Sequence, residues 1–88
     1  MEYTLQLAVV RPMDIRQLFA RNLRAARGAK GLSQEALAYE ADLDRTYISS
    51  LERGRYYASL KAIEKIAKVL EIDPAELLRK EGGSPGHE

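Results

Sequence analysis

The 88-residue chain contains no cysteine and no tryptophan, and it has one histidine and one phenylalanine. The lack of cysteine excludes disulfide bonds and zinc sites that need a thiolate. Because the single histidine, His87, is the residue before the last, we expect no metal and no other cofactor. No nucleophile with a neighbouring base and no paired carboxylates in a cleft can be assembled, so the sequence predicts a protein that is not an enzyme.

Long apolar runs are also missing, since none approaches the roughly 20 residues that a transmembrane helix needs. No basic stretch followed by an apolar core opens the chain, as a signal peptide would require, and we expect a cytoplasmic protein. The net charge is only +1. Residues 14–58 contain eight Lys or Arg and six Asp or Glu, so any phosphate contacts are expected in this mildly basic part.

From Ile15 onward the apolar residues recur at helical spacing. Ser33, Asp44 and Asp73 are each placed to cap the first turn of a helix. Apolar residues just before each cap and four positions after it form the pair that fixes how the chain enters the helix. The sequence therefore predicts an all-α domain of five helices, at 15–29, 33–41, 44–53, 59–70 and 74–80.

We expect the helical domain to span residues 14–80, between an N-terminal extension at 1–13 and a disordered tail at 81–88. In residues 3–9, large apolar side chains alternate with Thr4, Gln6 and Ala8 at the period of a strand. Such a strand has no ladder partner in an all-helical chain, so it either pairs with a second subunit or belongs to an unstructured extension. A domain this small buries about 60% of its unfolded surface, and its thin core would gain from a partner subunit.

Residues 33–54 have the pattern of two helices joined by a short turn. Ala38 supplies a small side chain where the two backbones approach, and Asp42 lies in the turn, where a positive φ is needed. Ile48 and Leu51 face the core. The side chains left outward on the second helix are suited to hydrogen bonding with base edges and phosphates: Arg45, Thr46, Ser49, Ser50 and Arg53.

This pattern resembles the Cro/CI-type (Xre) helix-turn-helix family of phage and bacterial transcriptional regulators. The resemblance covers residues 15–78 and rests on three segments, GLSQEALA at 31–38, ISSLERG at 48–54 and SLKAIEKIAKVL at 59–70. The run LDRTYIS at 43–49 is most similar to the controller proteins of restriction–modification systems.

The resemblance implies a compact, five-helix, lambda-repressor-like fold that binds double-stranded DNA. It implies a homodimeric transcriptional regulator, such as a repressor or a controller of a restriction–modification operon, that reads a palindromic operator in the major groove. We expect no small-molecule ligand, because the chain has no room for a separate sensing domain. The alternative is an antitoxin-like protein or co-regulator whose main partner is another polypeptide.

The family's functional positions can be placed on this chain. The residue matching Gln34 holds a phosphate, the positions matching Arg45, Thr46 and Ser50 reach bases, and the buried ion pair maps onto Arg27 and Glu52. The expected DNA contacts are Gln34, Arg45, Thr46, Tyr47, Ser49, Ser50, Arg53 and Arg55. For Tyr47, packing against the core is the alternative to a phosphate contact, and for Arg53 and Arg55 it is attraction to the carboxyl end of a helix.

The loop after Gly54 departs from the family pattern, which has Asn-Pro where this chain has Tyr57 and Ala58. Arg55, Tyr56 and Tyr57 therefore either touch phosphates or form an exposed loop with its aromatic rings packed down. The dimer contact is expected from the last two helices, with Ile72, Leu77 and Leu78 as candidates.

Overall fold

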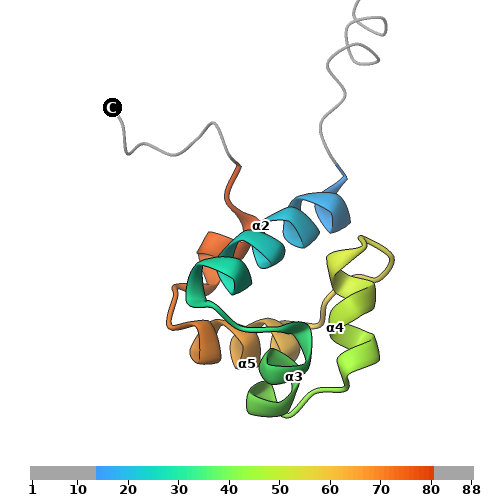
Figure 1. The fold of residues 1–88 in the computed structure, drawn as a ribbon. Helices are drawn as coiled ribbons and strands as arrows, with labels where there is room; N and C mark the ends of the chain where they lie inside the picture. Colours follow the sequence, from blue (N-terminus) through green and yellow to red (C-terminus); the bar gives the residue numbers. More distant parts are fainter. Residues whose placement is uncertain (1–13, 81–88) are drawn as a thin grey trace, which may run out of the picture.

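The computed structural model describes residues 14–80, which fold into four α-helices followed by one 3-10 turn and contain no strand (Figure 1). The elements are α2 (Ile15–Lys30), α3 (Gln34–Ala41), α4 (Arg45–Glu52), α5 (Leu60–Leu70) and η1 (Pro74–Leu78). No helix among the described residues is long and apolar enough to cross a membrane. The predicted extension at 1–13, with its possible strand, and the predicted tail at 81–88 lie outside the described residues.

Each element begins where a short polar side chain caps its free N–H groups. Ser33 Oγ accepts from the N–H of Ala36 at 3.0 Å, and Asp44 Oδ1 accepts from the N–H of Thr46 at 2.8 Å. The caps of the five elements are Asp14, Ser33, Asp44, Ser59 and Asp73. These bonds are local in sequence, which is why the helix starts were predictable to within one residue.

The helix ends use left-handed backbone conformations. Gly31 closes α2 with φ 77°, Asp42 closes α3 with φ 58° and Glu71 closes α5 with φ 57°. The positive φ expected at Asp42 is confirmed. Glutamate has no special preference for this conformation, so the sequence contained no signal for the turn at Glu71.

The prediction of a fifth α-helix at 74–80 is wrong. Pro74–Leu78 is a 3-10 turn, and the chain is extended again at Arg79. The side-chain amide of Asn22, on α2, donates to the carbonyl oxygens of Leu77 at 3.0 Å and Arg79 at 2.9 Å. These long-range bonds fix the chain against α2 and satisfy its carbonyls without a continuing helix.

The core lies where all five elements meet. Both α2 and α3 pack against α4, while α5 packs against α3 and η1, and η1 also packs along α2 (Figure 1). The largest fully buried side chains come from every element: Leu23, Leu37, Ile48, Leu51, Ile66 and Leu77. The short recognition-type helix α4 is thus held between α2 and α3.

Two of the three residues expected at the dimer contact, Leu77 and Ile72, pack against the core instead. Leu77 is 0% exposed within this one chain, so it contributes to the core, and its assignment to a dimer contact is wrong. Its burial follows from the packing of η1 on both α2 and α5. Ile72 is half-buried against the same core, whereas Leu78 and Ile15 are exposed.

Truncating Leu23 to alanine should lower the free energy of unfolding by about 2–5 kcal/mol, because it leaves a cavity at a fully buried position. Urea unfolding followed by circular dichroism measures the change. The matched control is Tyr39→Ala, whose side chain is 85% exposed on α3 and whose loss should cost about 0.5 kcal/mol or less. Equal effects of the two substitutions would contradict the assigned core.

Candidate nucleic-acid interface

One face of α4 is open to solvent and carries hydrogen-bonding side chains. Arg45, Ser49 and Arg53 follow one another at intervals of four residues, so they lie on one side of the helix axis. Arg45, Thr46 and Arg53 are exposed, and Ser49 is half-buried. A helix with such a face fits the major groove of B-DNA, where arginine can donate two hydrogen bonds to guanine.

Ser50 does not belong to this face. Its side chain was expected to point outward, but the residue is only 7% exposed. Helix α4 packs against both α2 and α3. The buried part of its surface is therefore wider than the single row of apolar residues in its sequence predicts. The prediction that Ser50 contacts a base is therefore wrong. The open face of α4 has one residue fewer than expected.

The end of α4 is fixed by the buried carboxylate of Glu52, which is 3% exposed. Arg27 on α2 donates to it twice, from Nε to Oε2 at 2.6 Å and from the terminal nitrogen to Oε1 at 2.9 Å. Gln34, the first residue of α3, donates from Nε2 to Oε1 at 3.0 Å. The structure thus places Arg27 and Glu52 in an ion pair and adds Gln34 as a third member.

Two further bonds from α2 complete this cluster. The Arg27 guanidinium also donates to the carbonyl of Leu32 at 2.8 Å, and the Arg24 guanidinium donates to the carbonyl of Glu52 itself. Together they join the end of α2 to the segment before α3 and to the last turn of α4. Because Gln34 bonds to Glu52, the start of α3 and the open face of α4 are held in one arrangement.

Burial raises the pKa of the Glu52 carboxyl, but the hydrogen bonds from Arg27 and Gln34 and the nearby positive charges of Arg27 and Arg24 lower it more. The net pKa lies below the ordinary value. A carboxyl whose pKa is lower in the folded protein stabilises the fold only while it is ionised.

Tyr47 packs against the core, and a phosphate contact from it stays a prediction. It is half-buried against the core, its hydroxyl oxygen accepts the N–H of Ser59 at 3.2 Å, and its ring lies 6.4 Å from that of Tyr56. In the loop after α4, the ring centre of Tyr57 lies 4.8 Å from the guanidinium carbon of Arg16 on α2. Arg55 is exposed, and a phosphate contact from it stays a prediction.

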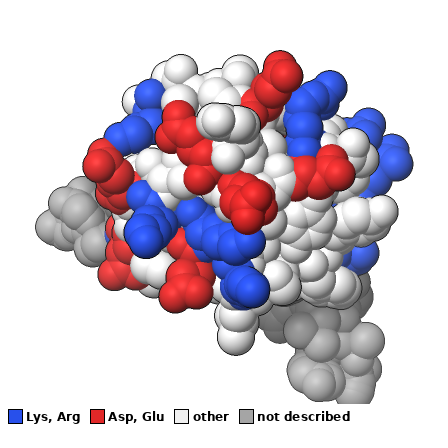
Figure 2. Space-filling view, turned by 90° about the horizontal axis from the view of Figure 1, so that it is seen from below, with Lys and Arg blue, Asp and Glu red and all other residues white. Residues whose placement is uncertain are grey.

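Charges elsewhere on the molecule are mixed. Seen from below, on the side where α3 and α5 lie, acidic and basic side chains alternate instead of forming a field of one sign (Figure 2). Lys65 pairs with Asp42 at 3.9 Å, and Lys30 pairs with Glu71. This surface is therefore a weak candidate for contact with DNA phosphates.

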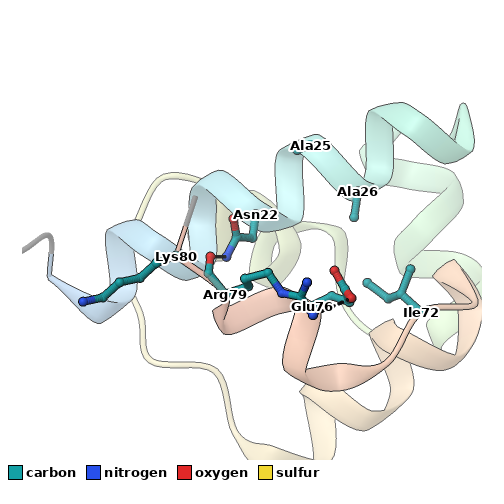
Figure 3. Close-up of a pocket in the computed structure, with 7 residues that line it drawn as sticks. All are labelled: Asn22, Ala25, Ala26, Ile72, Glu76, Arg79 and Lys80. Atoms are coloured by element: carbon teal, nitrogen blue, oxygen red, sulfur yellow. Dashed lines mark hydrogen bonds and ion pairs between the residues drawn. The ribbon is translucent and has the colours of Figure 1, made fainter. Parts of the chain in front are cut away.

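A hollow between α2 and η1 has small residues, Ala25 and Ala26, on its α2 side (Figure 3). The Asn22 amide is bonded to backbone carbonyls, and Arg79 pairs with Glu76 at 2.9 Å. These polar groups hold η1 in place and are not aimed at a ligand. No cluster of three or more metal-ligating side chains occurs within residues 14–80.

The predictions from sequence give no role to two arginines of α2, Arg21 and Arg24. Their spacing of three residues, continued at Arg27, is the signal that was present. That spacing places all three on one side of α2. Only the fold shows that this side borders α4.

The model of the helix-turn-helix family matches residues 23–77, which is more than half of the chain. The chain belongs to this family, and the predicted membership of its Xre type is confirmed. Its relatives include control proteins such as C.BamHI, C.SmaI and C.MunI. It is 52% identical to control protein C.BamHI of Bacillus amyloliquefaciens over 66 residues, which are 74% of this chain and 82% of that protein.

The fold is also similar to two solved structures of controller proteins. The restriction–modification controller protein C.AhdI from Aeromonas hydrophila has 48% identity and a TM-score of 0.69, over 70% of this chain and 94% of that one. The structure of C.Esp1396I bound to a 25 base pair operator site has 35% identity and a TM-score of 0.66, over 75% of this chain and 87% of that one.

Acid should weaken the fold through Glu52. Because its folded pKa is lowered, its contribution is complete above pH 4.5, the ordinary value for the group, and is lost as the pH falls through the folded value. We expect Glu52→Gln to lower the free energy of unfolding at neutral pH by about 1–3 kcal/mol. The variant's unfolding free energy should then fall less steeply than that of the wild type as the pH is lowered below 4.5.

Urea titrations at a series of pH values measure this difference. The control is Glu71→Gln, which removes an exposed ion pair with Lys30 and should change stability by about 1 kcal/mol or less at neutral pH. An acid sensitivity that is the same in Glu52→Gln and the wild type would show that the buried cluster does not have the assigned role.

Proposed function

We propose that this chain is a sequence-specific DNA-binding transcriptional regulator of the controller class, acting on the operator of a restriction–modification operon. The observation that carries the proposal is the open face of α4, with Arg45, Thr46 and Ser49 presented by a helix that Glu52 holds rigidly. The similarity to C.Esp1396I, solved on operator DNA, supports the same assignment. Such a regulator acts where the DNA is, in the cytoplasm, and has no catalytic step.

In this proposal the protein reads DNA in two ways. Arg45 and Thr46, in the first turn of α4, contact base edges in the major groove, with Ser49 beside them. Gln34, at the start of α3, contacts a phosphate, where the free N–H groups of a helix start also favour an anion. Arg53 and Arg55 follow α4 and lie where a second stretch of backbone would pass.

The low net charge argues for a dimer on a palindromic site. A chain with net charge +1 gains little from bulk attraction, so a few placed contacts must be doubled to give useful specificity. In a two-fold complex the two α4 helices enter successive major grooves, about 34–36 Å apart. The operator is then predicted to consist of two half-sites separated by about one turn of DNA.

Four of the exposed apolar side chains lie together and supply a surface for this dimer. Ile15, Tyr56, Tyr57 and Leu78 line a shared hollow, and Leu60 at the start of α5 is 83% exposed. An apolar group of this kind on a small domain is typical of a protein–protein contact. Leu78 thus remains a candidate, and the tyrosines, Ile15 and Leu60 take the place of Leu77.

Arg45→Ala should abolish the preference for the operator over a scrambled duplex, because a bidentate contact to guanine contributes about 1–3 kcal/mol of discrimination. Gln34→Ala should weaken binding to both duplexes by a similar factor, since a phosphate contact carries no sequence information. Fluorescence anisotropy with a duplex selected by the protein from random DNA measures both. If Arg45→Ala keeps the ratio of the two affinities, the assigned face of α4 is wrong.

Leu60→Glu should convert the dimer to a monomer, because it places a charge in the apolar contact while its exposure spares the fold. Sedimentation equilibrium at tens of micromolar protein distinguishes the two states. Tyr39→Glu, at an equally exposed position on α3, should stay dimeric. A wild-type protein that is strictly monomeric and shows no operator preference would favour the antitoxin-like or co-regulator alternative.

A further inference from the structure

A hollow with a basic lining lies between α2 and the end of α4. Its lining consists of Gln17, Ala20, Arg21, Arg24, Arg53 and Gly54. Three of these six described residues are arginines and none is acidic. We call this group the basic hollow.

The two helices bring these arginines together from distant parts of the sequence. Arg21 and Arg24 lie one turn apart on α2, and Arg53 directly follows α4. The left-handed residue Gly54, with φ 71°, turns the chain against α2, where the position of its missing Cβ is 3.6 Å from Cγ of Gln17. The backbone after α4 is therefore in contact with α2, and Arg53 stays beside the α2 arginines.

One hydrogen bond fixes the position of Arg24 within this group. The Arg24 guanidinium donates to the backbone carbonyl of Glu52, which is a dipole and not a charge. The carboxylate of Glu52 is directed to Arg27 and Gln34 instead. A guanidinium held in this way loses less side-chain entropy when it binds an anion, and its fork of donors matches two oxygens of a phosphate.

The position of the basic hollow relates it to the open face of α4. Arg53 is the third residue of the series Arg45, Ser49 and Arg53, so the hollow lies at the far end of that face. In Figure 1, α4 runs from its lower end up toward α2, and its last turn is the part nearest α2. A duplex contacted along α4 would bring its backbone to this end.

We propose that the basic hollow binds a phosphate of the operator backbone, with Arg21 and Arg24 of α2 acting together with Arg53. This inference rests on the proposed function and adds α2 to the DNA-contacting elements. The contact is independent of base sequence, so it adds affinity and sets the orientation of the protein on the duplex.

The test compares Arg21→Gln, Arg24→Gln and the double variant with the wild type. Anisotropy titrations use the duplex selected from random DNA and a scrambled duplex of equal length, each over a series of salt concentrations. Each lost phosphate contact should reduce the log–log salt slope by about 0.9 and weaken binding to both duplexes by the same factor. The control Lys68→Gln removes an equal charge from an exposed position on α5 and should leave the slope unchanged.

Thermal unfolding verifies that each variant is folded, and if Arg24→Gln is not, Arg21→Gln alone decides the test. A wild type that prefers the selected duplex, with unchanged slopes in the α2 variants, would overturn this inference and leave the proposed function intact. No preference in the wild type would overturn both. A further experiment adds inorganic phosphate without DNA. The phosphate could stabilise the wild type and not Arg21→Gln, while the salt slopes for DNA stay unchanged. That result would assign the hollow to a free anion and would also overturn the inference.

Discussion

The buried carboxylate of Glu52 is the constraint on which the arrangement of the molecule depends. A carboxylate removed from water is costly unless charged and polar donors replace the lost hydration. Here Arg27 and Gln34 supply those donors from two different helices. Helix α4 is only eight residues long, too short to be stable in isolation, so its conformation and direction come from these contacts and from its packed face.

This arrangement also explains how so weakly charged a protein can present a DNA-binding face. The same Gln34 that bonds to Glu52 stands at the start of α3, where a phosphate is favoured. A displacement of α3 would therefore disturb α4, and the base-contacting and phosphate-contacting positions keep a fixed relation. Preorganisation of this kind lowers the entropy cost of binding, which matters more when bulk electrostatic attraction is small.

Sequence reasoning worked best where the cause was local. The caps at Ser33, Asp44 and Asp73 and the left-handed turn at Asp42 depend on residues within four positions, and the structure has them all. It failed where the cause was distant. The segment after Pro74 is a 3-10 turn because Asn22, more than fifty positions away, bonds to its carbonyls.

By itself, the sequence determined the four α-helices, their starts and the family, because periodicity, caps and motif spacing are properties of neighbouring residues. Only the tertiary structure decided which side chains remain at the surface. Ser50 is covered because α4 packs against two helices, and Leu77 is buried in the core. Arg21 and Arg24 of α2 border the end of α4. Exposure depends on how many elements surround a position, and that number is set by the packing of the whole domain.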